Sequence, residues 1–534
     1  MASGLHIQRP AGKVIAMIQR FSCLAFLCVL AAACTQPAPS GPRVAMPNAA
    51  PTLDNAQNRE QNAQDDIRIA AVLPLSGPEA RLGDAMAKAI ELAFFQAADP
   101  RIALQFFDSA GSNAALESRA FLVQTVEDFA PTAVIGPLFS DTAQALAPVM
   151  LERGVPVLSF SNDMAANAAG AILLGQQPEQ EVARVLAHVA GALETRRIGM
   201  ILPDDIYGSR VSIAADATLR ALNALEEERY EARKLAFAQH SRSRVFASLV
   251  PGQPSVFPEP TYETAPIEGN IAFGTEQRDA EEDTLEPIKL FNVTVSERYP
   301  RSLRELDIPA RRVAQFYKRE AEVAAEREFL TQLDDPMGLD YLDYIRNIDT
   351  FGQPAYDAIL IAEGGQILRA LAPLLNVYSV DEEEIQFLGT GLWNDPGLSR
   401  EPALHGGLFA TAAPAAGPQF AQRYLNSYSE SPPPLAAAAY DAMSILAMAA
   451  RDRTGAPSVF NPARLFAERG YNGASGLLRI LPSGITERTL AIMKITESGL
   501  MTVDQAPTRF APYERPGAQE PLQEQTIASD PVSR

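Results

Sequence analysis

Small polar side chains follow two short apolar runs in one stretch of the chain. The run Ala133–Ile135 is followed by Ser140, and the run Val155–Leu158 is followed by Ser159 and Ser161. Hydroxyl groups donate and accept hydrogen bonds, so this pattern suits the binding of a polar or anionic ligand. A helical pattern begins at Ser140, and a helix N-terminus adds backbone N–H groups that have no partner within the helix.

Each of these serines also has a purely structural interpretation. Ser140 suits the N-cap position of the helix that follows it, which is compatible with ligand contact. Ser159 and Ser161 can simply end a strand. The pattern therefore indicates half of a binding cleft and leaves open which hydroxyl groups reach a ligand.

Three later side chains are candidates for the same cleft. Tyr207 follows the apolar run Arg197–Leu202, Glu363 follows another run, and Trp393 lies in a glycine-rich turn. Glu363 can cap the next helix or face a ligand ammonium group. Tyr207 can be a packed aromatic with a bonded hydroxyl, and Trp393 can line a cleft, form an interface or belong to the core.

The histidines and cysteines form no recognisable catalytic pattern. The four histidines are His6, His188, His240 and His405, and the three cysteines are Cys23, Cys28 and Cys34. The histidines lack metal-ligand spacing, and the sequence contains no G-x-S-x-G, H-E-x-x-H, P-loop or G-x-G-x-x-G motif. We therefore predict no catalytic residue, no metal site and no cofactor, in a protein that is not an enzyme.

The N-terminus has the pattern of a secretory signal that ends at a cysteine. Basic residues precede an apolar stretch too short for a stable membrane anchor, and the stretch ends in Leu30-Ala31-Ala32-Ala33-Cys34. This end resembles the lipobox of bacterial lipoproteins, which implies a lipid on Cys34. By resemblance to enterobacterial lipoprotein sorting, Thr35 in place of Asp favours the outer membrane, facing the periplasm. The alternative is an ordinary signal peptide with an incidental Cys34.

The body of the chain alternates strand and helix patterns from Ile67 onward, which predicts an α/β fold with parallel sheets flanked by helices. The net charge is -20, from 45 Lys and Arg against 65 Asp and Glu. Nucleic-acid binding needs clustered basic charge, so we expect no nucleic-acid partner. The length of 534 residues favours two lobes with tails.

The composition also predicts boundaries. The expected segments are a signal peptide at 1–33, a disordered tether at 34–66, lobe 1 at 67–177 and 401–470, lobe 2 at 178–400 with a large insertion at 240–350, a lobe 2 return with a closing hairpin at 471–503, and a disordered tail at 504–534. The insertion interrupts the strand–helix rhythm, and its first half is rich in prolines and acidic runs. Segments of this length are usually functional or disordered.

Several motifs, taken in order, resemble a known family. They are Ile69–Gly77, Val134–Pro137 with Ser140, Gly154–Ser161, Asp205–Gly208, Ala439–Ala442 and Gly473–Pro482. This series resembles the type I periplasmic-binding proteins of the leucine-binding group. The resemblance implies two α/β lobes joined by three crossovers, with a ligand closing the cleft between them.

Within that family, the segment Phe387–Trp393 and the lipoprotein-like N-terminus look most like the penicillin-binding protein activators. These are outer-membrane lipoproteins that stimulate a peptidoglycan synthase. The resemblance implies a non-catalytic regulator whose partner is a penicillin-binding protein. The enterobacterial activators carry a helical-repeat domain before this fold, and here only the tether precedes it.

The alternative function is the substrate-binding component of an ABC-type amino-acid importer. Its partners would be an ABC permease and a small amino-acid-like ligand, and its only membrane contact would be the lipid anchor. By the family resemblance, Ser140, Ser159 and Ser161 would hold the ligand carboxylate, and an acidic residue of the other lobe would hold the ammonium group.

Overall fold

The computed structural model describes residues 67–110, 116–193, 195–249, 287–332, 336–412, 417–451, 460 and 465–513. All of them lie in one compact unit, Gln64–Arg534. The predicted signal peptide, Cys34, the tether, the centre of the insertion and the end of the tail lie outside the described residues. Among the described residues, no helix combines the length and the hydropathy needed to cross a bilayer.

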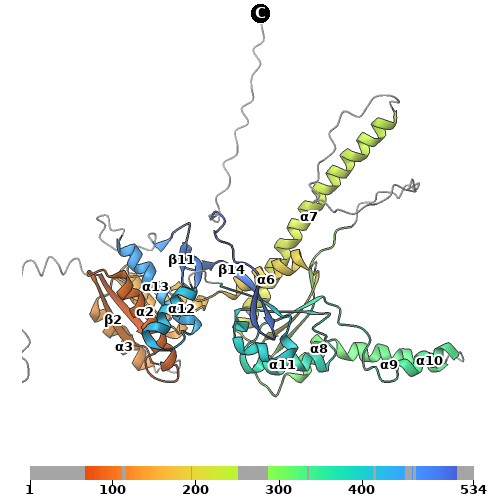
Figure 1. Cartoon of the computed structure of the whole chain (residues 1–534), viewed down its shortest axis with the longest axis horizontal. Coiled ribbons are helices and arrows are strands. Elements are labelled where there is room, and N and C mark those ends of the chain that lie inside the picture. Colours follow the sequence, from red (N-terminus) through yellow and green to blue (C-terminus); the bar gives the residue numbers. More distant parts are fainter. Residues whose placement is uncertain are drawn as a thin grey trace, which may run out of the picture. The chain divides into compact units, whose positions relative to one another are not determined.

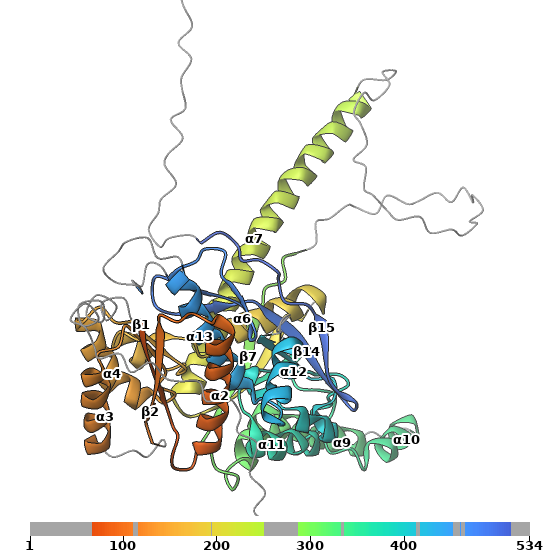
Figure 2. The same cartoon turned by 60° about the vertical axis from the view of Figure 1, so that its left-hand side comes forward.

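The first sheet contains five parallel strands in the order β2-β1-β3-β4-β5. Its strands are β1 (Ile67–Leu73), β2 (Ile102–Asp108), β3 (Ala133–Ile135), β4 (Val157–Ser159) and β5 (Ile172–Leu173). Its helices are α2 (Ala80–Ala97), α3 (Leu116–Phe129), α4 (Ser140–Glu152), α5 (Met164–Ala168), α12 (Gly417–Tyr428) and α13 (Pro434–Arg451). Figures 1 and 2 show these helices around the sheet.

Both faces of this sheet are buried, as the apolar runs of its strands predict. Ile69 and Ala71 of β1 pack in one core with α2 and α13, whereas Ala70 and Val72 pack in another core with α3 and α4. Side chains alternate between the two faces of a strand, so one short apolar run supplies both cores.

The second sheet has the order β15-β14-β10-β9-β8-β6-β7, and β14 is antiparallel to both of its neighbours, β10 and β15. Its strands are β6 (Arg197–Pro203), β7 (Asn292–Tyr299), β8 (Ala358–Ile361), β9 (Gln386–Gly389), β10 (Leu408–Ala412), β14 (Leu490–Thr496) and β15 (Gly499–Asp504). Its helices are α6 (Pro178–Ala192), α7 (Ile206–Leu249), α8 (Asp307–Val313), α9 (Phe316–Gln332), α10 (Pro336–Ile345) and α11 (Gly365–Val377), with the 3-10 turns η1 (Gly391–Trp393), η2 (Pro396–Arg400) and η3 (Pro402–Leu404). Helices α6 and α7 cover one face, and α8 and α11 cover the other.

A small third sheet connects the two larger ones. It consists of β11 (Tyr471–Gly473), β12 (Gly476–Ile480) and β13 (Thr486–Arg488), and β12 contributes side chains to the core of the first sheet. The chain passes between the large sheets after β5, after β10 and after β13. These three passages agree with the three crossovers that the resemblance implied.

Two predicted boundaries differ from the observed ones. Strand β10 lies in the second sheet between β9 and β14, so lobe 1 resumes at α12 and not at residue 401. Within the predicted closing hairpin at 471–503, the turn at Pro482–Gly484 joins β12 to β13, whereas β14 (Leu490–Thr496) belongs to the second sheet. Strand partners depend on long-range packing, which local apolar runs do not specify.

Part of the predicted insertion at 240–350 belongs to the second lobe itself. Strand β7 pairs with β6 along its length, and α8 packs into the core of the second sheet. Helix α7 continues as one long helix to Leu249 (Figures 1 and 2). The predicted tail also begins too early, because β15 runs to Asp504 and the Ala511 carbonyl accepts a hydrogen bond from Arg479.

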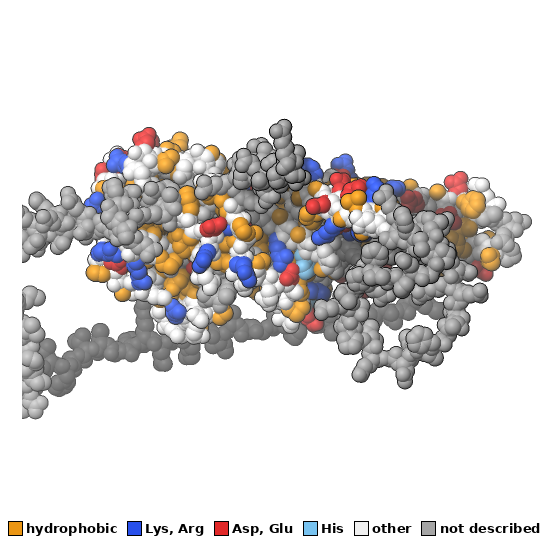
Figure 3. All heavy atoms as spheres, turned by 90° about the horizontal axis from the view of Figure 1, so that it is seen from above, with side chains coloured by type: hydrophobic (Ala, Val, Ile, Leu, Met, Phe, Trp, Pro, Cys, Tyr) orange, Lys and Arg blue, Asp and Glu red, His pale blue; other side chains and the backbone are white. Residues whose placement is uncertain are grey.

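Charged side chains of both signs are distributed over the surface. On the face drawn in Figure 3, basic and acidic side chains are interspersed among hydrophobic ones. Many of the described arginines are paired with carboxylates, as Arg197 is with Asp357. On that face (Figure 3), this mixture differs from the clustered basic charge of a nucleic-acid interface.

Candidate functional site

A cavity of about 800 Å³ is bounded by segments from both large sheets. The segments that follow β3, β4 and β5, together with α13, supply one part of its wall. The first turns of α6 and α7, the η1 turn and the end of β10 supply the other part. The carboxyl ends of parallel strands are the usual ligand-binding edge of an open α/β sheet, so the cavity lies where the sequence predicted a cleft.

Ser140 and Ser161 line this cavity, but both hydroxyl groups already have partners. The Ser140 hydroxyl donates to Asp163 Oδ2 at 2.6 Å, and the Ser161 hydroxyl accepts from the Asp163 backbone N–H at 3.0 Å. Asp163 also caps α5 by accepting from the Ala165 N–H at 2.9 Å. The Ser140 hydrogen bond is the main cause of a lowered pKa at Asp163, so the pair holds a carboxylate at the cavity wall.

Ser159 does not line the cavity. Its side chain is fully buried, and its hydroxyl donates to the Pro137 carbonyl at 2.9 Å and accepts from the Ser161 N–H at 3.2 Å. These bonds tie the end of β4 to the segment after β3. The structural interpretation of this serine therefore fits its position.

The replacement Ser159→Ala tests that interpretation. We expect the free energy of unfolding to fall by about 1 kcal/mol, because the Pro137 carbonyl and the Ser161 N–H lose a buried partner. Denaturant unfolding measures the loss, and ligand affinity should be unchanged. Ser161→Ala is the matched comparison, since its hydroxyl makes a similar local bond but lines the cavity; a larger affinity change in Ser159→Ala would contradict the assignment.

Of the three later candidates, only Tyr207 lines the cavity. Its hydroxyl lies 2.7 Å from Thr390 Oγ1, and burial raises its pKa. Glu363 is buried away from the cavity, where Oε2 accepts from the Tyr299 hydroxyl at 2.7 Å and from Arg301 Nε at 3.1 Å. It is therefore already paired within its own lobe.

Trp393 is also a core residue and not a cavity wall. Its side chain is fully buried, and its indole N–H donates to the Glu363 carbonyl at 2.9 Å. The ring packs where a side chain on Gly389 or Gly407 would collide with it. The sequence correctly placed Trp393 in a glycine-rich turn, and the glycines leave space for its ring.

Two buried charged residues of the cavity carried no recognisable signal in the sequence. Glu181 lies in the first turn of α6 with 5% of its surface exposed, and its Oε2 accepts from the Gly391 N–H at 2.9 Å. Burial raises the pKa of Glu181 to about 7. Its amphipathic helix gave no indication that this carboxyl group would face a cavity.

Arg488, the second of these residues, stands at the end of β13. It donates to Ser475 Oγ at 2.6 Å and to the Leu174 carbonyl at 2.8 Å. Ser475 in turn donates to the buried Asp441, which also accepts from the Ala474 and Ser475 N–H groups at 2.6 and 2.8 Å. Burial lowers the pKa of Arg488 and raises that of Asp441.

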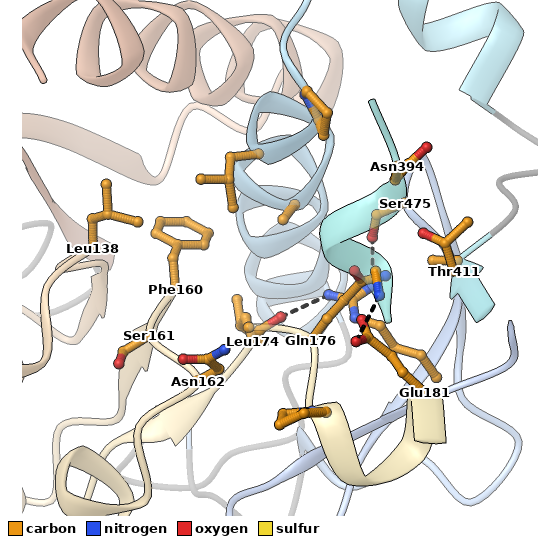
Figure 4. Close-up of a pocket in the computed structure, with 18 of the residues that line it drawn as sticks. Leu138, Phe160, Ser161, Asn162, Leu174, Gln176, Glu181, Asn394, Thr411 and Ser475 are labelled. Carbon is orange, nitrogen blue, oxygen red and sulfur yellow. Dashed lines mark hydrogen bonds between the residues drawn. The ribbon is translucent and has the colours of Figure 1, made fainter. Parts of the chain in front are cut away.

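The rest of the cavity wall combines an apolar part and a polar part. Figure 4 shows Leu138 and Phe160 on one side and Gln176, Glu181 and Thr411 on the other. An apolar wall with a few converging polar groups is the common construction of a small-molecule site.

Arg210 of α7 connects the two lobes beside the cavity. Its guanidinium donates to the Asn162 carbonyl at 2.6 Å, to Gln177 Oε1 at 2.7 Å and to both carboxylate oxygens of Glu179 at 2.7 Å. Asn162 follows β4 of the first sheet, whereas α7 covers the second. The bond to the Asn162 carbonyl therefore joins the second lobe to the segment that carries Ser161, and the bonds to Gln177 and Glu179 tie α7 to the start of α6.

The described part of the chain contains no group of three or more His, Cys, Asp or Glu side chains that could hold a metal ion. The residues that line the cavity offer hydrogen bonding, charge and apolar contact.

Comparison with known proteins identifies this architecture. Residues 66–240 match the model of a family described as periplasmic binding protein. A putative branched-chain amino acid ABC transporter protein from Rhodospirillum rubrum is 16% identical, with a TM-score of 0.54 over 82% of this chain and all of that one. The chain has the type I periplasmic binding protein fold.

Two further structures with this periplasmic binding fold are similar to the chain. An ABC transporter substrate-binding protein from Sphaerobacter thermophilus is 15% identical, with a TM-score of 0.50 over 84% of this chain and 99% of that one. A solute binding protein from R. palustris in complex with 4-hydroxybenzoate is 12% identical, with a TM-score of 0.50 over 84% and 98%. A search of curated proteins found no match.

Proposed function

We propose that this protein is the substrate-binding component of an ABC-type importer and captures a small amino-acid-like solute in its cleft. The observation that carries this proposal is the cavity of about 800 Å³ at the strand ends of both lobes. Small-molecule sites commonly enclose about 300–1,000 Å³, so the cavity has room for an amino acid or an aromatic acid.

The residues around the cavity divide into two groups under this proposal. Ser161 and Tyr207 contact the solute directly, and Ser140 holds the neighbouring Asp163 carboxylate in place by its hydrogen bond. Ser159, Glu363 and Trp393 support the wall from behind it. No residue in either group is assigned a catalytic role, because capture and release require no covalent step.

The location proposed with this function is the periplasm. A lipid on Cys34 would anchor the chain, and residues 34–66 would give the body freedom to move from the membrane. The partner in import would be an ABC permease. Detection of the lipid by mass spectrometry, and its loss in Cys34→Ser, test the anchor.

Binding is tested by calorimetry and thermal shift on the purified chain, with the standard free amino acids, benzoate and 4-hydroxybenzoate as ligands. At a concentration 100 times its Kd, a ligand should stabilise the folded protein by about 2.7 kcal/mol. A solute that binds with one-to-one stoichiometry supports the proposal. If none of these compounds binds, the proposal is contradicted.

A cavity-filling pair of variants locates the bound solute. Ala437 lines the cavity, whereas Ala449 on the same helix is also half-buried but lies away from it. We expect Ala437→Phe to weaken binding at least about tenfold, because its ring occupies the volume of the solute. Ala449→Phe is the control for the cost of a larger side chain on α13, and equal loss in both variants would contradict binding in the cleft.

The second candidate function is activation of a penicillin-binding protein, with the lipid on Cys34 in the outer membrane. The observation that favours it is the exposure of apolar side chains on α9 and α10, including Phe329, Met337 and Tyr344 at 57%, 79% and 71%. Such side chains suit a protein interface. Pull-down of a purified peptidoglycan synthase by the full chain, lost in Met337→Glu with Tyr344→Glu, would support this function, provided that the solute panel is silent.

A further inference from the structure

A buried cation faces the cleft. Arg488 lines the cavity, and only 8% of its surface is exposed. An arginine is rarely buried to this extent unless an anion or a set of hydrogen-bond acceptors compensates its charge. The groups around this guanidinium therefore indicate what it is built to bind.

The compensation inside the protein is incomplete. The two side-chain hydrogen bonds of Arg488 go to the neutral acceptors Ser475 Oγ and the Leu174 carbonyl, and its Nε has no hydrogen-bond partner. Among the described residues, no carboxylate oxygen lies within 4.0 Å of its guanidinium nitrogens. A guanidinium has five N–H donors, so this one retains hydrogen-bonding capacity.

The carboxylate linked to Arg488 is Asp441, which does not line the cleft. Asp441 is reached only through the Ser475 hydroxyl, and it is occupied by donors from Ala474 and Ser475. Asp441 lines a separate cavity of about 350 Å³ and not the cleft, whereas Arg488 lines the cleft and also a smaller cavity of about 190 Å³. The cation and its balancing anion are thus arranged with the positive side toward the cleft.

We propose that Arg488 is the anion-binding group of the cleft and that the solute carries a single carboxylate on an apolar body. This inference rests on the proposed solute-binding function and names the residue and the ligand chemistry within it. A carboxylate matches the planar fork of a guanidinium and would supply the acceptor oxygens that the site lacks.

The remaining wall favours a monocarboxylate over phosphate. Glu181 lines the same cavity, and its carboxyl group would disfavour a second negative charge nearby. Leu138, Phe160 and Leu435 present apolar surface that a hydrated phosphate would not use but an aliphatic or aromatic body would cover. One cation, one nearby carboxyl group and an apolar wall together fit a monoanion with a hydrocarbon part.

The test compares each carboxylate with its neutral amide of nearly the same shape. Calorimetry on the purified chain uses L-leucine against L-leucinamide, benzoate against benzamide, and inorganic phosphate as a separate arm. The wild-type protein should prefer the carboxylate by about tenfold to a hundredfold in at least one pair, as expected for hydrogen bonds to charged groups. Arg488→Met should remove that preference, and Arg488→Lys should retain part of it.

The preference ratio separates a direct role from a structural one. A variant that merely disturbs the wall would weaken carboxylate and amide equally, and that result would overturn the assignment of Arg488. Equal binding of both pair members by the wild-type protein, or tight binding of phosphate alone, would overturn the carboxylate proposal while leaving a solute-binding function intact. No binding of any solute by the wild-type protein would refute the proposed function and this assignment with it.

Discussion

Replacing Trp393 with alanine should lower the free energy of unfolding by about 3–5 kcal/mol, among the largest losses that a single substitution can produce here. The indole ring is fully buried in the core of the second lobe, and its N–H bond to the Glu363 carbonyl would be lost with it. The space between Gly389 and Gly407 would then be left empty. Denaturant unfolding with a constant m-value measures the loss.

Leu392 provides the control for Trp393. It precedes the tryptophan in the η1 turn and is 44% exposed, so Leu392→Ala should cost less than about 1 kcal/mol. The affinity ratio between a carboxylate and its amide should be unchanged in Trp393→Ala, since the indole does not line the cavity. If the Trp393→Ala protein is instead stable and its ligand preference is altered, Trp393 would be assigned to the wall of the cleft.

Replacing Glu181 with glutamine should stabilise the ligand-free protein at neutral and alkaline pH. Burial raises the pKa of Glu181 from 4.5 to about 7 in the folded chain. Between pH 4.5 and pH 7, Glu181 loses its proton in the unfolded chain but keeps it in the folded chain. The stability that the protonated Glu181 gives the folded chain below pH 4.5 is therefore lost as the pH rises through 7. The loss amounts to about 3 kcal/mol.

Stability profiles between pH 4 and pH 8 therefore test Glu181. The wild-type and Glu181→Gln proteins should differ little at pH 4, and the variant should be more stable by up to about 3 kcal/mol at pH 8. Glutamine retains an oxygen that can accept from the Gly391 N–H. Glu179→Gln is the matched control, because Glu179 lies on the same turn but forms an ion pair with Arg210. If the stability of the wild-type protein changes with pH in the same way as that of Glu181→Gln, the prediction is contradicted.

Much of the first lobe could be predicted from the sequence because its signals are local. The run Ala133–Ile135 forms β3 and α4 begins at Ser140, both as the pattern predicts. The apolar run that begins at Ile67 likewise predicts a strand, and it forms β1. In a parallel sheet covered on both faces, continuous apolar runs mark strands and amphipathic segments mark helices, so the order of elements follows from the order of patterns.

The residues that line the cleft could be predicted only in part. Ser140, Ser161 and Tyr207 line the cavity because each follows the carboxyl end of a parallel strand. Ser159 is the last residue of β4 and Trp393 follows β9, but both side chains point into the interior, where their polar atoms bond to backbone carbonyls. Position along a strand indicates the edge of the sheet at which a residue lies, but packing decides whether its side chain faces the cleft.

The α/β alternation, the two lobes and the edge of each sheet at which the cavity lies all follow from patterns within the sequence. The tertiary structure decided that β10 joins the second sheet and that Glu181 and Arg488 share one cavity. Glu181 opens α6 and Arg488 closes β13, on segments far apart in the chain. Local patterns carry information about hydrogen bonding and amphipathicity within a segment, whereas the burial of a charge and the pairing of a strand depend on which distant segments pack against it.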